Sequence, residues 1–176
     1  KENFSSDDFY LVPTVYWSLT STRVLTTERV KGISLGDRES LVEAGVDLEQ
    51  LVENLLKSFL LQVFRDGFFH ADLHPGNLFA DQKGNILPVD FGIMGHMDIK
   101  SRYYLAELML AFLTRNYRKA AEIHFEAGYV PRNKSLDAFA LSCRAIGESI
   151  LDKPPNEVSI GRLLYQLLRT TEFFEM

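Results

Sequence analysis

Four polar side chains that could do chemistry follow two short apolar runs in the middle of the chain. The first run is followed by Asp72, His74 and Asn77, and the second run ends at Val89, directly before Asp90. Carboxylate and amide oxygens are hard ligands of the kind that Mg²⁺ prefers, and Mg²⁺ commonly holds phosphate groups. A further carboxylate can accept a proton from an attacking hydroxyl or orient it. These residue types therefore predict phosphoryl transfer, with Asp72 as the base and with Asn77 and Asp90 as metal ligands.

The order of these residues matches two loops of kinases. Residues 70–77 read HADLHPGN, which fits the H-x-D-x-x-x-x-N pattern of a catalytic loop, and residues 90–92 read DFG, as in a metal-binding loop. Pro75 and Gly76 favour a turn that brings the end of the first loop back beside Asp72. Either motif alone is common, but both in this order after neighbouring short strands indicate phosphotransfer ancestry.

One alternative for the same residues is a hydrolytic metal site, because imidazole and carboxylate ligands suit Zn²⁺ or Fe²⁺. Its ligands would be His70, Asp72, His74 and Asp90. This alternative leaves Asn77 and the Phe-Gly pair after Asp90 without a role.

The two histidines of the first loop are expected to have different roles. His70 stands two residues before Asp72, where kinases carry a buried histidine that hydrogen-bonds to the backbone, and we expect the same here. His74 stands where protein kinases usually carry a lysine that reaches the transferred phosphate. A histidine is shorter and mostly neutral at pH 7. Only residues 93–97 separate the metal loop from the next predicted helix, so an ordinary peptide acceptor is disfavoured, while ATP hydrolysis or an unusual acceptor stays open.

The chain resembles the UbiB family of atypical kinases, the ADCK-like proteins of ubiquinone biosynthesis. The resemblance rests on VFRDGFFHADLHPGN at 63–77, on VLTTERVKG at 24–32, and on DFGIMG at 90–95 followed by Arg102 and Tyr103. The run from Ala71 to Asn77 is shared with aminoglycoside and choline kinases, which are small-molecule phosphotransferases. The residues before that run and the helices after it favour the UbiB family.

The resemblance implies ATP and Mg²⁺ as cofactors. The catalytic residues would be Asp72, His74 and Asn77, and the metal ligands would be Asn77 and Asp90. The resemblance also implies a nucleotide-binding hinge between two lobes. There the backbone groups of Glu28 and Val30 would meet adenine, with Thr27 at the back of the pocket, although an ordinary edge hairpin would fit the same residues.

The implied fold is α+β and mainly α: a protein-kinase-like C-terminal lobe with a short β-hairpin from the edge of the N-terminal lobe. Residues 1–31 would hold the last N-lobe strands and the hinge, and residues 32–176 would form the helical lobe with the loops 70–77 and 90–92. The family's nucleotide loop, phosphate-facing lysine and Lys-x-Gly-Gln segment do not occur in the sequence. We therefore interpret the chain as a piece of a longer protein that folds but does not turn over ATP at a useful rate alone.

For the longer protein, the resemblance implies an ATPase or phosphotransferase that supports ubiquinone biosynthesis at the cytoplasmic face of a bacterial inner membrane. Its partners would be ATP, a quinone-precursor lipid and other proteins of ubiquinone biosynthesis, and membrane association would come through parts absent from this chain. Two alternatives are a small-molecule phosphotransferase of the aminoglycoside- or choline-kinase type and a nucleotide-switched scaffold for lipid intermediates. The last predicted helix, with Phe173 and Phe174, could also lean on a membrane or a partner protein.

Composition limits the remaining classes of protein. The 176 residues are 46% hydrophobic and 24% charged, which suits a globular domain with a core. The net charge of −5 argues against a nucleic-acid-binding surface. The single cysteine, Cys143, excludes an internal disulfide and fits a reducing compartment. The longest apolar stretch, residues 108–113, is far shorter than the ~20 residues that cross a bilayer, so we expect this piece to be soluble or peripheral.

Hydrophobic periodicity predicts the elements that position the loops. Residues 12–19 and 23–30 alternate and predict a hairpin that turns at 20–22. Helices are predicted over 37–44, 47–66, 99–114, 117–127 and 136–151 and from 160 onward. Asp98, Asn116, Ser135 and Ser159 are the predicted N-terminal caps of four of these helices. Gly67 and Gly128 are expected to end helices, and Pro154 to Asn156 to break the chain before the last helix.

Two apolar stripes and two polar segments carry further expectations. The second helix should face the core along its length through Leu48, Leu51, Val52, Leu55, Leu56, Phe59 and Val63. The last helix should pack through Leu163, Leu164, Leu167 and Leu168. Residues 1–8 are expected to be a loose polar lead-in. Arg65 and Asp66 are expected to have solvated ends, with pairing to each other or to loop residues as the alternative.

Overall fold

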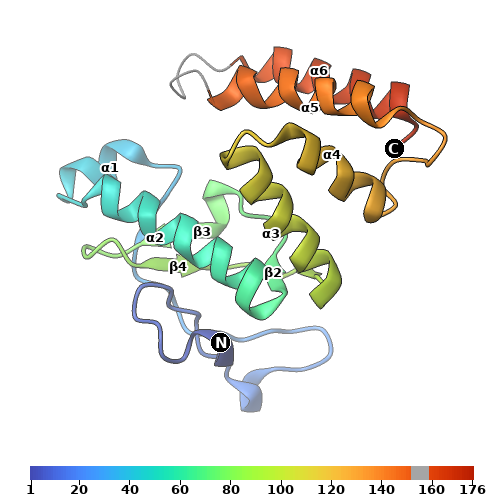
Figure 1. Ribbon diagram of the computed structural model, residues 1–176. Coiled ribbons are helices and arrows are strands. Elements are labelled where there is room, and N and C mark those ends of the chain that lie inside the picture. Colours follow the sequence, from blue (N-terminus) through green and yellow to red (C-terminus); the bar gives the residue numbers. More distant parts are fainter. Residues whose placement is uncertain (152–158) are drawn as a thin grey trace. The chain divides into compact units, whose positions relative to one another are not determined.

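The computed structural model describes residues 1–151 and 159–176, and these form two compact units, Lys1–Met97 and Asp98–Met176 (Figure 1). The first unit contains the strands and both predicted loops, whereas the described residues of the second unit are helices and short connections. The chain is therefore mainly helical with small antiparallel sheets, which confirms the α+β, mainly α fold class. The division of the chain into hinge residues 1–31 and a lobe 32–176 stays a prediction.

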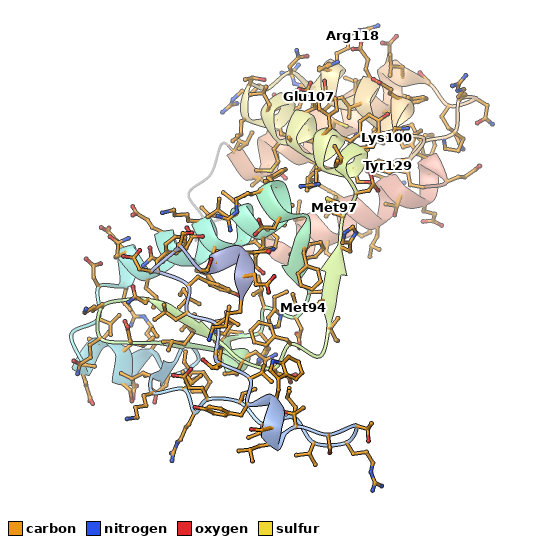
Figure 2. All side chains as sticks on the ribbon, turned by 90° about the horizontal axis from the view of Figure 1, so that it is seen from below. Met94, Met97, Lys100, Glu107, Arg118 and Tyr129 are labelled. Carbon is orange, nitrogen blue, oxygen red and sulfur yellow. The ribbon has the colours of Figure 1, made fainter. Side chains whose placement is uncertain are left out.

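Within the fully described unit Lys1–Met97, two small antiparallel sheets hold the loops. One sheet has the order β1-β3-β4, with β1 (Ile33–Ser34), β3 (Leu78–Ala80) and β4 (Ile86–Pro88), and the other pairs β2 (Phe68–His70) with β5 (Met94–His96). The loop 71–77 leaves β2 and enters β3, and the segment 89–93 leaves β4 and enters β5. Met94, the first residue of β5, is labelled in Figure 2. Each loop thus crosses from one sheet to the other, so the pairing of both sheets fixes both ends of each loop.

Two helices in this unit begin where the sequence predicts. Asp37 caps α1 (Arg38–Glu43) and Asp47 caps α2 (Leu48–Leu60) by accepting hydrogen bonds from backbone N–H groups of the first turn. The long helix continues as a π-helical segment, η3 (Leu61–Asp66), and ends at Gly67. Gly67 has a φ of 62°, a left-handed conformation that glycine adopts without a Cβ clash. The predicted extent is confirmed, but its last six residues are wound as a π-helix, which is rare and frequent at functional sites.

The apolar stripe of the long helix is only partly buried, so the expectation that all of it faces the core is wrong. Leu51 and Val63 are buried, but Val52 and Leu56 are 63% and 57% exposed. Three polar residues one turn apart are buried along the same helix, namely Asn54, Ser58 and Gln62. Each hydrogen-bonds to backbone: the Asn54 amide, for example, donates to the Gly84 carbonyl at 2.9 Å.

The first residues of the chain pack into the core, so the expectation of a loose lead-in is wrong. They begin with a 3-10 turn, η1 (Glu2–Phe4), and Phe4, Phe9 and Tyr10 join the buried cluster of the first unit. The Ile86 N–H donates to the Phe9 carbonyl and the Leu11 N–H donates to the Ile86 carbonyl, both at 2.8 Å. The segment is thus hydrogen-bonded to the edge of β4, and its aromatic rings are buried in the core of the first unit.

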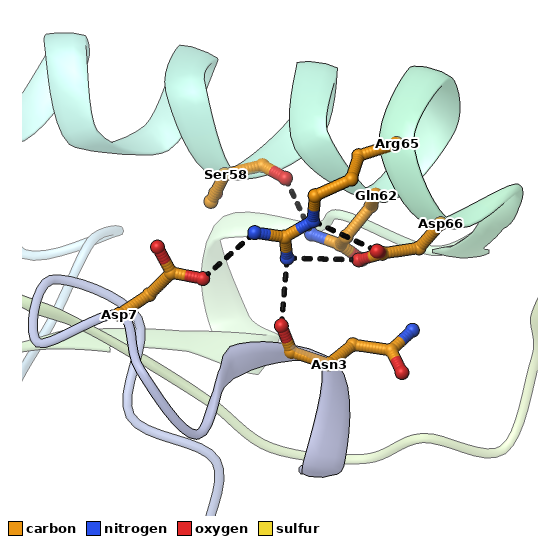
Figure 3. A network of polar contacts seen from close by, with 6 residues as sticks. All are labelled: Asn3, Asp7, Ser58, Gln62, Arg65 and Asp66. Carbon is orange, nitrogen blue, oxygen red and sulfur yellow. Dashed lines mark hydrogen bonds and ion pairs between the residues drawn. The ribbon is translucent and has the colours of Figure 1, made fainter.

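Arg65 joins the end of the long helix to this first segment, as Figure 3 shows. Its Nη1 lies 3.0 Å from Asp7 Oδ2, its Nε lies 2.8 Å from Asp66 Oδ1, and its Nη2 donates to the Asn3 carbonyl at 2.7 Å. The guanidinium also stands 4.9 Å from the centre of the Phe4 ring. The hydrogen bonds to Asp66 and then to Asp7 raise the pKa of Arg65. The expectation of solvated ends for Arg65 and Asp66 is therefore wrong, and the alternative that the two residues pair with each other is confirmed.

Replacing Arg65 with Met is expected to loosen residues 3–11 and to lower the free energy of unfolding by about 1 kcal/mol, because the pair is partly exposed. Amide hydrogen exchange of Leu11 should become faster, and thermal unfolding should shift to lower temperature. Arg144→Met is the matched control, since Arg144 pairs with Glu148 along one helix face. Equal exchange and equal unfolding temperature in the two variants would contradict this role of Arg65.

The predicted hairpin is present as a pairing but not as regular strands. Bridges join Val15 to Thr27 and Ser21 to Val24 in the antiparallel sense. The tight turn lies between Ser21 and Val24, slightly later than the predicted 20–22. The predicted antiparallel pairing is confirmed, and the prediction of two regular strands is wrong.

Threonine side chains explain why the hairpin is irregular. The Thr26 N–H donates to Thr20 Oγ1 at 3.2 Å, and Thr26 Oγ1 donates to the Leu19 carbonyl at 2.6 Å. These bonds take backbone groups that a strand ladder would use. A 3-10 turn, η2 (Trp17–Leu19), fills the interrupted part.

The described residues of the second unit form the helices α3 (Ile99–Leu113), α4 (Tyr117–Glu126), α5 (Leu136–Leu151) and α6 (Ile160–Phe174). Asp98, Asn116 and Ser135 accept N–H bonds at the starts of the first three, as predicted. Capping by Ser159 stays a prediction, and the predicted break at Pro154 to Asn156 lies outside the described residues. Among the residues that the structure describes, no helix combines the length and apolar character needed to cross a bilayer.

Phe139 of α5 lies at the centre of one of the two buried clusters described in the second unit. It is 2% exposed, and its ring centroid lies 4.8 Å from that of Phe174, 5.0 Å from that of His124 and 6.0 Å from that of Phe125. Burial lowers the pKa of His124, so the aromatic surroundings favour the neutral form of this ring.

The apolar side of α6 is largely exposed, so its predicted packing is wrong. The exposed residues include Leu164, Leu167 and Leu168. The helix turns a different side toward α5, where Gln166 and Thr170 line a small cavity with Ser142 and other residues of α5.

Candidate functional site

Asp72, near the start of the predicted catalytic loop, lies beside Asn77 at its end. The 3-10 turn η4 (Pro75–Asn77) brings the chain back, and Asn77 Nδ2 donates to Asp72 Oδ2 at 3.1 Å and to the Asp72 carbonyl at 3.3 Å. The contact predicted from Pro75 and Gly76 is confirmed. Because the amide nitrogen of Asn77 donates to Asp72, the remaining side-chain atom that could bind a metal ion is Oδ1.

His70 connects the two loops from beneath and is 1% exposed. Its Nδ1 accepts the Asp72 N–H at 3.1 Å, so the neutral ring carries its proton on Nε2, which lies 3.3 Å from the Val89 carbonyl and donates to it. The ring also contacts Phe91, with 5.5 Å between centroids. The predicted buried, backbone-bonded role of His70 is confirmed.

Asp90 adopts a left-handed backbone conformation with a φ of 56°. Such a conformation is uncommon for a residue other than glycine and is concentrated at functional sites. The Gly92 N–H donates to Asp90 Oδ1 at 3.2 Å. Just before it, the Val89 N–H donates to the Asn77 carbonyl at 2.8 Å. Val89 is therefore held by both Asn77 and His70, and the backbone of this one residue sets where Asp90 stands relative to the catalytic loop.

The donor set fits Mg²⁺ better than a hydrolytic Zn²⁺ or Fe²⁺ centre. Both ring nitrogens of His70 are engaged with backbone, which removes it as a ligand. Over residues 1–151 and 159–176, no three His, Cys, Asp or Glu side chains gather as a metal-binding group. Mg²⁺ needs few protein ligands, because it keeps waters and binds phosphate oxygens. The Asp90 carboxylate and the Asn77 amide oxygen match that requirement.

His74 is exposed, and its side chain caps the turn that follows it. Its Nδ1 accepts the Gly76 N–H at 3.1 Å at the start of η4, so the side chain is held at the mouth of the turn. Its predicted catalytic role stays a prediction.

The predicted hinge residues share no hydrogen bond with the two loops in the described part of the chain. The Glu28 N–H donates to the Thr14 carbonyl at 2.7 Å, and the Thr14 N–H donates to the Glu28 carboxylate at 3.1 Å, which lowers the pKa of that carboxyl. The Glu28 carbonyl and the Val30 N–H have no partner among the described residues. These are the acceptor and donor that an adenine edge could use. Thr27 is exposed, and its place at the back of a pocket stays a prediction.

Gly32 follows the predicted hinge residues and lies close to β3. A Cβ on Gly32 would stand 2.8 Å from the Ala80 carbonyl oxygen. The neighbouring cavity has a volume of about 520 Å³ and is lined by Lys31, Gly32, Ile33, Ala80, Asp81, Gln82 and Lys83. Because none of the residues of the two loops lines it, this cavity is distinct from the predicted phosphate site.

Gly32→Ala is expected to push the hinge away from β3 and to lower the free energy of unfolding by about 1–3 kcal/mol, since the clash is with rigid backbone. Chemical denaturation followed by circular dichroism measures the change. Gly36→Ala is the matched control, because its added Cβ would meet only ordinary contacts, 3.5 Å from Ser34 Oγ. A Gly32→Ala variant as stable as Gly36→Ala would show that the hinge has room to move.

Sequence reasoning missed Gln62 and Val89, which support the site without belonging to a motif. Gln62 Oε1 accepts the His70 N–H at 2.9 Å. A signal for Gln62 existed, since it is a polar residue within an otherwise apolar helical stripe, next to Val63. Val89 acts through its backbone, so its residue type carries no signal.

Comparisons with known proteins match both units. A profile of the ABC1 atypical kinase-like domain matches residues 1–124, and a profile of the UbiB helical domain matches residues 143–176. The curated relative from Photobacterium profundum, named probable protein kinase UbiB, is 39% identical over 180 residues, which cover 100% of this chain and 33% of that protein. The protein of the same name from Azotobacter vinelandii is 38% identical, and the match covers 100% of this chain and 34% of that protein.

A third relative of that name, from Xanthomonas axonopodis pv. citri, is 40% identical over 97% of this chain and 32% of its own length. The chain thus spans about a third of the length of these relatives. Among solved structures, the bifunctional kinase-methyltransferase WbdD aligns with 99% of this chain and 39% of its own, at 18% identity and a TM-score of 0.39.

Proposed function

Because this chain belongs to the ABC1 atypical kinase-like family, we propose that it supplies the catalytic and metal-binding loops of an ATP-dependent kinase-like enzyme that supports ubiquinone biosynthesis. The observation that supports the proposal is the pairing of Asp72 with Asn77, joined through His70 and Val89 to the strained Asp90. The family match also separates this proposal from the aminoglycoside- and choline-kinase alternative, which we do not retain.

In the proposed reaction, bound Mg²⁺ would neutralise charge that builds on the phosphate oxygens of ATP. Asp90 and the amide oxygen of Asn77 would hold the metal ion. Asp72, exposed and held by Asn77, would accept a proton from the attacking hydroxyl or water or orient it. His74, fixed by its bond to Gly76, would present its Nε2–H to the transferred phosphate.

Adenine would bind at the hinge through the Glu28 carbonyl and the Val30 N–H, beside Thr27. The phosphate-facing lysine and covering loop would come from the parts of the longer protein that precede these residues in the family. For that protein we propose a quinone-precursor lipid and other ubiquinone-biosynthesis proteins as partners, at the cytoplasmic face of the inner membrane. The residues 1–176 alone should then bind nucleotide weakly and turn over little ATP.

The test is ATP hydrolysis by the protein at the full length of its relatives, with Mg²⁺ or with a chelator, and with or without vesicles that contain a quinone-precursor lipid. We expect turnover that needs Mg²⁺, and far less from residues 1–176 alone. Robust Mg²⁺-dependent turnover by residues 1–176 would show that turnover does not need the phosphate-facing lysine of the longer protein. Absence of both nucleotide binding and turnover in the full-length protein would refute the proposed function.

A further inference from the structure

Gln62 is a buried amide that is bonded at both ends. It is 4% exposed and lies within the π-helical segment η3. Its Oε1 accepts the His70 N–H at 2.9 Å, and its Nε2 donates to the Ser58 carbonyl at 3.2 Å, the second of which is drawn in Figure 3. An amide with partners on both its oxygen and its nitrogen has one preferred orientation, so Gln62 holds the His70 backbone at a defined place on the helix.

The hydrogen bonds continue from His70 to the predicted site. His70 Nδ1 accepts the Asp72 N–H at 3.1 Å, and Nε2 donates to the Val89 carbonyl at 3.3 Å. Val89 in turn donates its N–H to the Asn77 carbonyl at 2.8 Å. One connected chain of hydrogen bonds, buried at Gln62 and part-buried at the His70 ring, therefore runs from the long helix to the backbone of Asp72, to the residue before Asp90 and to Asn77.

We infer that Gln62 is a positioning residue for phosphoryl transfer, acting through His70 on both loops. This inference rests on the proposed function. Gln62 cannot touch the substrate, because it is buried beneath the catalytic loop on the helix side of His70. Removing its oxygen would leave the His70 N–H without its acceptor and let strand β2 shift, and with it the backbone of Asp72. A displacement of about 1 Å at reacting groups costs up to roughly 100-fold in rate.

Asn54 provides a control on the same helix. It is also buried, at 8% exposure, two helical turns before Gln62, and its Nδ2 donates to the Gly84 carbonyl in the turn between β3 and β4. That bond supports the fold, but its acceptor lies outside both loops. Asn54→Leu therefore removes a buried amide hydrogen bond of the helix without cutting the connection from Gln62 to His70.

The experiment compares Gln62→Met, Gln62→Glu and Asn54→Leu with the wild type in the protein at the full length of its relatives. In Gln62→Met, kcat for ATP hydrolysis should fall by about 10- to 100-fold while KM for ATP stays within about twofold. Amide exchange at Asp72 should also become faster. Gln62→Glu, which keeps an acceptor oxygen, should recover most of kcat, and Asn54→Leu should lower the unfolding temperature but keep kcat.

Two outcomes would overturn the inference. One is a Gln62→Met enzyme with the kcat of the wild type or with a loss that Asn54→Leu matches at equal stability. The other is unchanged exchange of the Asp72 amide in Gln62→Met. The exchange measurement does not depend on turnover, so it decides the positioning role even if the wild type hydrolyses no ATP and the proposed function fails.

Discussion

Asp90→Asn in the full-length protein is expected to abolish Mg²⁺-dependent binding and turnover of ATP, while Asp72→Asn lowers turnover by about 10²- to 10⁴-fold and leaves ATP binding intact. The difference follows from their proposed roles. Asp90 would supply the charged metal ligand, whereas Asp72 would act on the attacking group. Isothermal titration of MgATP and steady-state hydrolysis measure the two effects separately.

The substitution at Asp90 isolates charge from backbone geometry. Asn tolerates the left-handed conformation at φ 56° better than most residues, and its side-chain oxygen could still accept the Gly92 N–H. Asp81→Asn is the matched control: Asp81 accepts the N–H groups of Lys83 and Asn85 in the β3–β4 turn, outside both loops. ATP binding without turnover in the wild type, kept in Asp72→Asn and lost in Asp90→Asn, would favour a nucleotide-switched scaffold. Normal binding and turnover in both variants would remove these residues from the site.

Phe139→Ala is expected to lower the free energy of unfolding of the unit Asp98–Met176 by about 3–5 kcal/mol. Phe139 is 2% exposed, and its ring is surrounded by the rings of His124, Phe125 and Phe174. The other buried members of this cluster include Tyr117, Ala121, Val130 and Cys143. Removing the ring therefore leaves a cavity that several side chains line and that the packed helices can close only in part.

Phe173→Ala is the control for that prediction, because Phe173 is 67% exposed although it neighbours Phe174 in the chain. Its cost should stay below about 1 kcal/mol. Urea unfolding monitored by helix content gives both values. A loss at Phe139 no larger than that at Phe173 would mean that the aromatic cluster does not hold the helices of this unit together.

Features governed by neighbouring residues could be predicted from the sequence. Asp37, Asp47, Asp98 and Asn116 start helices because a capping side chain bonds to N–H groups two or three residues later. The contact of Asp72 with Asn77 follows from the same kind of local rule, since a Pro-Gly turn lies between them. The resemblance to a family added the roles of these residues, which spacing alone leaves open.

Features governed by distant residues could not be predicted in this way. Arg65 meets Asp7 across 58 positions of sequence, and no pattern near either residue indicates the pair. Val52 and Leu56 lie on an apolar stripe yet are exposed, whereas Asn54 on the same helix is buried with its amide bonded to the distant Gly84 carbonyl. The predicted hairpin has no regular strands, because the hydroxyls of Thr20 and Thr26 bond to backbone groups that a strand ladder would use. Composition alone does not reveal these side-chain hydrogen bonds.

The docking of the first residues on β4 has a consequence for synthesis on the ribosome. Phe9 and Leu11 exchange hydrogen bonds with Ile86, so their partner is translated long after they are. At typical elongation rates of about 5–20 residues per second, the interval between Leu11 and Ile86 lasts roughly 4–15 s. During this time Phe4, Phe9 and Tyr10 lack the strand that later covers them. The nascent chain thus carries an aromatic segment without its final partner until β4 is made, and its burial is a late step that depends on contacts of high sequence separation.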